Sequence, residues 1–163
     1  MERNSILYKI RRKGQIFAHL VLPDQWLCKI YSRIILKKGV DLKNPKTFNE
    51  KIQWLKLYNY PQNELVIQGA DKYKVREYVK NKGLEKILVP MIGDWDSVDE
   101  IDWDSLPAKF VLKCNHGCAY NIICSDKSSL NKKEAIKKMR KWMTEDFGGY
   151  TIETHYSKIK PHI

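Results

Sequence analysis

The chain has 163 residues, which fits one hydrophobic core and excludes two large independent domains. Apolar residues make up 43% of the chain and aromatic residues 11%, a composition that excludes a disordered tail. Thirty Lys and Arg against 19 Asp and Glu give a formal charge of +11, so the surface is expected to attract anions such as nucleotides, nucleic acid, anionic lipid or acidic polysaccharide.

The four cysteines lack the dense spacing of a small secreted disulfide scaffold, which favours a reducing, cytoplasmic setting. The apolar stretches near the N-terminus are interrupted by Lys, Arg and His, so neither a signal peptide nor a spanning helix is predicted. Membrane contact is therefore expected to be peripheral at most, at the inner face of the membrane.

Residues 1–41 predict an amphipathic helical segment. Asp24 is expected to cap a helix that ends before Gly39. Its apolar residues recur at helical spacing: Trp26, Leu27, Ile30, Tyr31, Ile34 and Ile35. Such a stripe is typical of a helix packed on a core, and a helix lying on an anionic membrane is the second interpretation.

Two further helices are predicted by their capping residues. Thr47 and Glu50 have the spacing of a capping box at the start of a helix. Asp71 is expected to cap a helix from Lys72 to Lys82, which Gly83 closes.

The second half of the chain alternates predicted strands and helices. Residues 87–90 favour a short strand, and the acidic segment 93–104 favours a solvated linker. Residues 110–113 and 121–124 predict two strands around a polar turn. The last predicted helix is capped by Asn131 and Glu134 and carries Ile136, Met139, Met143 and Phe147 up to Gly148 and Gly149. The order indicates an α/β (α+β) fold.

The turn between the two strands has the residues of a phosphate-binding loop. Lys113 ends the first strand, where its ammonium is held firmly. Gly117, followed by the small residues Cys118 and Ala119, allows backbone N–H groups to approach an anion closely. Lys72 lies at a helix start, where the macrodipole disfavours a cation, so it is a second candidate for binding a ligand. An ordinary hairpin with solvated lysines is the alternative.

Several separated blocks carry a resemblance to one family, and they occur in order along residues 42–163. They are NPKTFNEKIQWLKLYN (44–59), ADKYKVREYV (70–79), ILVPMIGDWDSVDEIDWDSLPAKFVLKCNHGCAYNIIC (87–124) and ETHYSKIKPHI (153–163). Together they resemble the TupA-like branch of the ATP-grasp superfamily, which is associated with the biosynthesis of teichuronopeptide and other cell-surface polysaccharides.

The resemblance implies an ATP site. Lys72 and Lys113 match the two lysines with which ATP-grasp proteins hold the phosphates of ATP, and the loop 115–120 is expected to close over the β- and γ-phosphates. The loop residues so implied are Asn115, His116, Gly117, Cys118, Ala119 and Tyr120, with Asn121 assisting from the second strand. The family more often has two small residues such as Ser-Gly where this chain has Cys118-Ala119, which puts a left-handed backbone at Ala119 in question.

The resemblance also implies a reaction class. ATP-grasp enzymes activate a carboxylate as an acyl phosphate that an amine displaces, with Mg²⁺ bridging the phosphates. The magnesium ligands and the adenine hinge are expected downstream of Ile163, so we interpret residues 42–163 as the N-terminal part of a truncated ATP-grasp domain whose C-terminal half is absent. Such a fragment is expected to lack ligase activity alone. A polysaccharide precursor and other polysaccharide-assembly enzymes are the implied partners.

Other chemistries are weaker interpretations of the same residues. The spacing Cys114-x-His116-x-Cys118, with Cys124, lacks the paired knuckles of a common zinc site. A nucleophilic Cys118 activated by His116 is conceivable. The aspartates of residues 94–104 are favoured as solvated side chains over metal ligands, so no metal is assigned to them.

Two other functions remain as alternatives. The charge of +11 suits a basic module that binds nucleic acid or an anionic polymer, although no specific nucleic-acid motif is present. The polysaccharide setting also suggests a glycosyltransferase-associated protein, for which Asp94-Trp95-Asp96 has the spelling of a D-x-D motif.

Overall fold

The computed structural model describes residues 6–163 and separates them into two units. Unit 1 contains the described residues up to 64 together with 146–158, and unit 2 contains residues 65–145 and 159–163. The chain therefore leaves unit 1, builds most of unit 2, returns to unit 1 and ends in unit 2. The ATP-grasp domain was predicted to begin at residue 42. The division into two units does not test that boundary, which stays a prediction.

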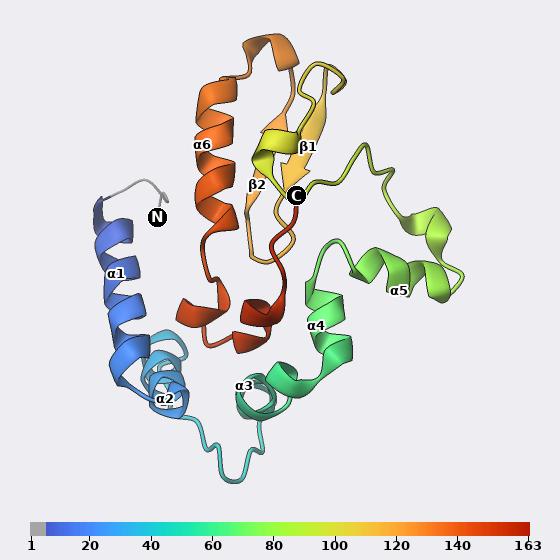
Figure 1. The fold of residues 1–163 in the computed structure, drawn as a ribbon. Coiled ribbons are helices and arrows are strands. Elements are labelled where there is room, and N and C mark those ends of the chain that lie inside the picture. Colours follow the sequence, from blue (N-terminus) through green and yellow to red (C-terminus); the bar gives the residue numbers. More distant parts are fainter. Residues whose placement is uncertain (1–5) are drawn as a thin grey trace. The chain divides into compact units, whose positions relative to one another are not determined.

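Unit 1 consists of helices (Figure 1). They are α1 (Ile6–Val21), α2 (Asp24–Ile35) and α3 (Phe48–Tyr58), with short 3-10 helices at Tyr60–Gln62, Gly148–Tyr150 and Thr154–Lys158. Its core is formed by Leu27, Cys28, Leu42 and Ile152. Ile152 comes from the returning segment, so residues more than a hundred positions apart share this core.

Helix α2 has the predicted extent, but two expectations about it are wrong. Asp24 is the first helical residue and not the cap; the N-cap is Pro23, and the Asp24 carboxylate lies 3.1 Å from Nδ1 of His19. The buried face is Leu27, Cys28 and Ser32. Most of the predicted stripe, namely Trp26, Ile30, Ile34 and Ile35, is exposed, because α2 turns Leu27 and Cys28 toward Leu42 and Ile152.

The capping box at the start of α3 is confirmed. Thr47 Oγ1 accepts a hydrogen bond from the Glu50 N–H at 3.3 Å, and Glu50 Oε2 accepts one from the Thr47 N–H at 2.8 Å. Glu50 also accepts hydrogen bonds from the N–H groups of Asp41 and Lys46. These donors, the Thr47 N–H first, lower the pKa of Glu50 to about 2.

Unit 2 is built around a β-hairpin with α6 running alongside it (Figure 1). Strands β1 (Phe110–Lys113) and β2 (Asn121–Cys124) have the predicted bounds and pair antiparallel. Phe110 lies opposite Cys124 and Lys113 opposite Asn121. The helices are α4 (Glu64–Ala70), α5 (Val75–Asn81) and α6 (Lys132–Met143), with 3-10 helices at Glu85–Ile87, Val98–Glu100 and Lys127–Ser129. Helices with one small sheet confirm the α+β class.

Three predicted elements of unit 2 differ in the structure. Residues 87–90 are not a strand: within residues 6–163 the sheet contains β1 and β2 alone, so this segment has no strand to pair with. The segment 93–104 is not a solvated linker, because Val98, Ile101 and Trp103 are buried. Helix α6 is capped by Asn131 as predicted but ends at Met143, five residues before Gly148.

None of the helices within residues 6–163 is both long enough and apolar enough to cross a bilayer.

Candidate functional site

A turn before α5 holds Lys72. The buried carboxylate of Asp71 accepts hydrogen bonds from the N–H groups of Tyr73 at 2.9 Å and Lys74 at 3.1 Å. These bonds keep residues 72–74 in a turn, so α5 begins at Val75 and not at Lys72 as predicted. Lys72 therefore projects from a fixed turn outside the helix.

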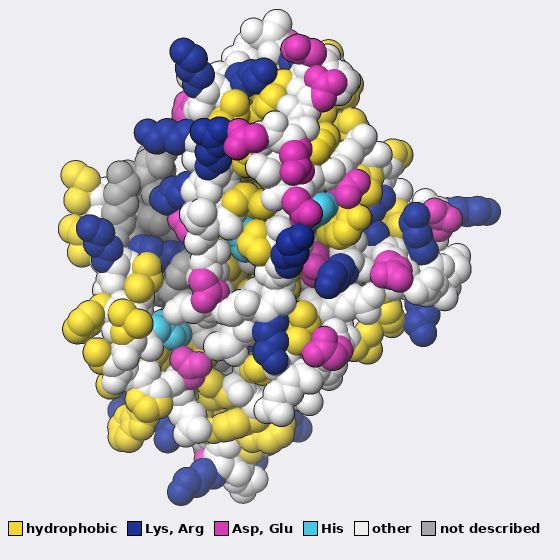
Figure 2. Space-filling model, in the orientation of Figure 1, with side chains coloured by type: hydrophobic (Ala, Val, Ile, Leu, Met, Phe, Trp, Pro, Cys, Tyr) yellow, Lys and Arg dark blue, Asp and Glu magenta, His cyan; other side chains and the backbone are white. Residues whose placement is uncertain are grey.

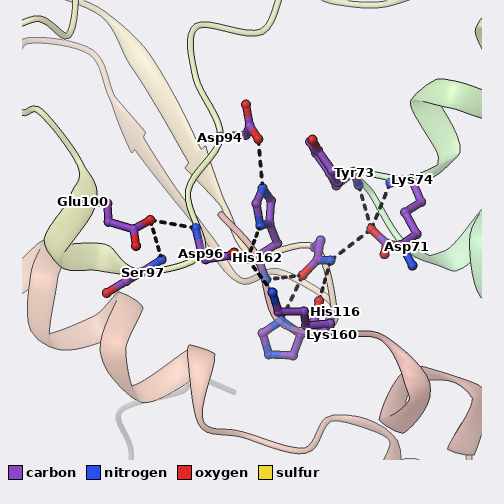
Figure 3. Close-up of polar contacts among 11 residues, drawn as sticks. Asp71, Tyr73, Lys74, Asp94, Asp96, Ser97, Glu100, His116, Lys160 and His162 are labelled. Carbon is purple, nitrogen blue, oxygen red and sulfur yellow. Dashed lines mark hydrogen bonds and ion pairs between the residues drawn. The ribbon is translucent and has the colours of Figure 1, made fainter.

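Asn115 connects this turn to the hairpin loop and to the end of the chain. Its Nδ2 donates to Asp71 Oδ1 at 3.0 Å and to the Lys160 carbonyl at 2.9 Å, and its Oδ1 accepts from the His162 N–H at 2.8 Å. Its own N–H donates to the His162 carbonyl at 2.9 Å. Asp71, Lys160 and His162, the residues that these hydrogen bonds join to the loop, are labelled in Figure 3. Asn115 thus has a structural role that the sequence did not reveal.

The ammonium of Lys72 is drawn against the hairpin loop. Its Nζ donates to the Asn115 carbonyl at 3.1 Å and to the Gly117 carbonyl. Although the residue as a whole is exposed, partial burial of this end lowers the pKa of Lys72. The thiols Cys118 and Cys114 and the Asp71 carboxylate oppose that shift, and Lys113 reinforces it. Lys72 and Lys113 are therefore close enough to repel each other.

Both lysines line one cavity of about 390 Å³ within unit 2. Such a volume is typical of ligand pockets, which measure roughly 300–1,000 Å³. Lys72, Lys113 and Arg76 make one part of its lining cationic. The rest is largely apolar and includes residues 89–92, Trp95, Leu106, Phe110, Leu112 and Ile163. Two like charges beside an apolar wall favour a ligand that combines an anionic group with a flat or apolar one.

The remainder of the loop is anchored at the end of α6. His116 is buried, with Nε2 at 2.9 Å from the Trp142 carbonyl. Tyr120 is buried as well, donates its hydroxyl to Glu145 Oε2 at 2.6 Å, and stacks on the Trp142 ring with centroids 5.5 Å apart. These contacts anchor the loop to Trp142 and Glu145. Neither His116 nor Tyr120 is part of the cavity lining.

Gly117 is needed for a different reason from the one predicted. A Cβ added to Gly117 would lie 2.4 Å from Cε2 of the Tyr120 ring, so the glycine allows this ring to pack against the backbone. The left-handed position of the loop is Ala119, with φ 55°. Ala119 therefore carries backbone strain that a glycine at this position would not have.

The structure brings together only some of the predicted site residues. Lys72, Lys113 and Asn115 line the cavity. The other predicted residues are not part of its lining: His116, Gly117, Cys118, Ala119, Tyr120 and Asn121. Their role in binding a phosphate stays a prediction.

Several residues of the cavity were missed in the sequence. Arg76 follows Lys72 by four residues, and in the helix predicted from Lys72 this spacing would have placed both side chains on one side. Its guanidinium donates to the Val89 carbonyl at 2.9 Å and so positions the apolar wall. Trp95 and Ile163 gave no signal, because they meet through paired backbone hydrogen bonds between distant segments.

The cysteine chemistry is not favoured by the structure. Cys114 is fully buried, and burial raises the pKa of its thiol to about 12. Both ring nitrogens of His116 lie within hydrogen-bond distance of other groups, the Asn115 side chain and the Trp142 carbonyl. Within residues 6–163, no group of three or more His, Cys, Asp or Glu side chains could hold a metal ion.

Asp94 and Asp96, the two aspartates of the D-x-D sequence, have partners within the protein. Asp96 Oδ1 lies 3.0 Å from Lys160 Nζ and 3.0 Å from His162 Nδ1, while Asp94 Oδ2 lies 3.3 Å from His162 Nε2 (Figure 3). Lys160, followed by His162, lowers the pKa of Asp96. These carboxylates hold the end of the chain, which accounts for them without a sugar nucleotide.

The residues present fit part of a Mg·ATP complex. The cationic lining suits the phosphates and the apolar lining suits a purine ring. The described residues offer no carboxylate cluster for magnesium, so no step involving the metal follows from this site.

A comparison with protein-family models matches residues 50–163, the greater part of the chain, to the model described as TupA-like ATPgrasp. Searches of curated proteins and of solved structures returned no match.

Proposed function

Because the chain belongs to the TupA-like ATP-grasp family, we propose that it binds ATP in the cavity of unit 2, with Lys72 and Lys113 on the phosphates. The observation that carries the proposal is the lining of one cavity by two lysines from separate segments. Neither lysine is neutralised by a carboxylate in a described salt bridge, so both charges are available to an anion.

Lys72 must exchange partners when ATP binds. Its ammonium now donates to the carbonyls of Asn115 and Gly117. A phosphate oxygen is a stronger acceptor for this ammonium than a neutral carbonyl, because its negative charge adds a direct Coulomb attraction to the hydrogen bond. The loop carbonyls thus hold Lys72 close to the cavity until the phosphate replaces them.

Calorimetric titration of ATP into the full chain tests the proposal. Lys113→Ala is expected to weaken ATP binding by roughly tenfold or more, since a charge-assisted hydrogen bond contributes about 1.5–3 kcal/mol. Lys109→Ala is the matched control, because Lys109 is exposed and lies outside the cavity lining. Equal affinities for the wild type and Lys113→Ala, or no ATP binding by either, would refute the proposal.

The ATP titration, combined with polymer-binding measurements at several salt concentrations, separates a nucleotide pocket from a polymer-binding surface. A module that binds nucleic acid or an anionic polysaccharide through its overall charge loses affinity steeply with salt and is insensitive to one lysine. A cavity that holds ATP with two lysines is expected to lose most of its affinity for ATP when either lysine is replaced. Loss of polymer binding with salt, together with unchanged ATP affinity in Lys113→Ala, would favour the basic module.

We further propose that ATP binding serves a carboxylate–amine ligase reaction in the assembly of a cell-surface polysaccharide such as teichuronopeptide, capsule or exopolysaccharide. The family supports this proposal. Magnesium, a polysaccharide precursor and other assembly enzymes at the inner face of the membrane are its proposed partners. That the 163 residues alone do not catalyse phosphoryl transfer stays a prediction, and release of ADP and phosphate from ATP by the purified chain would contradict it.

A further inference from the structure

Helix α1 presents an unpaired apolar stripe to solvent. Ile6, Ile10, Phe17, Leu20 and Val21 recur at spacings of three, four and seven residues, which places them on one side of the helix. All five are exposed; Phe17 keeps 66% of its surface accessible and Leu20 79%. A surface of this kind on a folded unit indicates an interaction site.

Helix α2 presents a second exposed stripe in the same unit. Trp26, Ile30 and Ile34 follow one another at four-residue spacing and are exposed, with Trp26 at 64%. Lys29 and Arg33 lie on the same side of the helix, and Lys29 Nζ lies 6.0 Å from the centroid of the Trp26 ring. Figure 2 shows yellow side chains projecting over α1 and α2 with dark blue ones between them.

The charge around these stripes has one sign. Residues 6–38 contain eight Lys or Arg and one Asp, a net charge of +7, whereas the whole chain carries +11. The single acidic residue, Asp24, is held by His19. The exposed apolar surface therefore lies in a segment that attracts anions and repels cations.

We propose that the exposed face of α1 and α2 docks on an anionic lipid bilayer. Apolar side chains with an exposed Trp, surrounded by Lys and Arg, are the composition of a helix that lies in the membrane interface. The face lies on the bilayer without crossing it, because neither helix is long and apolar enough to span. This docking is independent of the ATP cavity, which belongs to unit 2.

A second copy of the chain is a poorer occupant. A two-fold dimer through this face would bring the same patch of each protomer together, and two segments of net charge +7 would then oppose each other. An anionic headgroup layer instead neutralises the lysines and arginines while the apolar side chains enter the boundary of the acyl chains. Charge complementarity therefore selects the bilayer.

Sedimentation of the full chain with lipid vesicles tests the proposal. We expect binding to vesicles of phosphatidylcholine mixed with phosphatidylglycerol, decreasing as salt is raised, and negligible binding to phosphatidylcholine alone. The double variant Phe17→Ser/Leu20→Ser is expected to weaken binding about tenfold, because both side chains leave the interface. Lys29→Gln and Arg33→Gln are expected to weaken it about fivefold each.

The matched control is Ile123→Ser/Leu84→Ser, which removes two exposed apolar side chains from unit 2. It is expected to bind vesicles like the wild type. Each variant changes exposed residues, and its melting temperature confirms that it folds. The proposal is overturned if the chain ignores anionic vesicles, if both double variants weaken binding equally, or if Phe17→Ser/Leu20→Ser dissociates a dimer of the chain without affecting vesicles.

Discussion

Ala119 is the residue at which the hairpin loop carries backbone strain. Its φ of 55° places it in the left-handed region, where a side chain costs about 1–2 kcal/mol. Ala119→Gly removes that cost and adds about 0.4–1 kcal/mol of conformational entropy to the unfolded chain. We therefore expect a net increase of about 0.5 kcal/mol in the free energy of unfolding, measured by urea titration.

Ala108→Gly is the control for that substitution. Ala108 is an exposed residue without a positive φ, so glycine there brings only the entropic penalty and is expected to lower the free energy of unfolding by about 0.5–1 kcal/mol. A loss of stability of the same size in both variants would show that Ala119 is not strained.

Gly117 is the residue at which the loop depends on close packing. Gly117→Ala places a methyl group against the Tyr120 ring, which cannot move easily because its hydroxyl is bonded to Glu145. We expect a loss of roughly 1–3 kcal/mol in the free energy of unfolding. Gly69→Ala in α4 meets no atom within 4 Å and is expected to gain about 0.5–1 kcal/mol. Similar changes in both variants would contradict this account.

The sequence identified Lys72, Lys113 and the small residues of the loop, because cationic and glycine positions are local signals. It did not identify what Gly117 faces or what His116 and Tyr120 contact. The neighbours of His116 and Tyr120 come from the end of α6 and just beyond it, more than twenty residues away, and no local pattern encodes such a contact. Gly117 faces the Tyr120 ring, which is placed by those same contacts. Residue types thus predicted the chemistry of the site better than its packing.

At the scale of elements, Asn115 joins three segments: the Asp71 turn, the hairpin loop and residues 160–162. Asn115→Ala removes the side-chain hydrogen bonds to Asp71, Lys160 and His162, together with the contact to His116 Nδ1, so we expect a loss of roughly 2–3 kcal/mol in the free energy of unfolding. The His162 amide should also exchange faster with solvent. Asn121→Ala, an exposed position of β2, is expected to change stability by less than about 0.5 kcal/mol. Unchanged exchange at His162 in Asn115→Ala would contradict the assignment.

The capping box of α3 predicts a pH dependence. The pKa of Glu50 is lowered to about 2 in the folded chain, below the ordinary carboxyl value, so folding favours the ionised form. Its contribution is fully present above the unfolded pKa and is lost as the pH falls toward 2. We expect Glu50→Gln to narrow the difference in melting temperature between pH 6 and pH 3, as measured by circular dichroism. An equal difference in wild type and variant would refute this role.

Elements with local signals were predicted well, and elements that depend on partners were not. The capping box and both strands have the predicted positions, because caps and turn residues define them locally. Residues 87–90 have the composition of a strand, but a strand requires a partner, and β1 pairs only with β2 among residues 6–163. The stripe of α2 was predicted as buried, since periodicity gives the amphipathic faces and not which of them meets the core.

At the scale of the whole molecule, the proposed ATP binding and the proposed membrane docking belong to different units. Unit 2 contains the cavity with Lys72 and Lys113, and unit 1 contains the exposed faces of α1 and α2. The return of residues 146–158 to unit 1 had no signature in the sequence, because it depends on tertiary contacts such as the burial of Ile152 beside Leu27. The family resemblance, in contrast, was readable from ordered blocks and is confirmed.

The central claim is that Lys72 and Lys113 hold phosphate groups, and comparing the affinities for ATP and adenosine tests it most directly. Lys72→Ala and Lys113→Ala should each reduce ATP affinity by about tenfold or more while leaving adenosine affinity unchanged, since adenosine has no phosphate. A variant that weakens both ligands equally, or that lowers the free energy of unfolding without changing ATP affinity, would show that the lysines only support the fold.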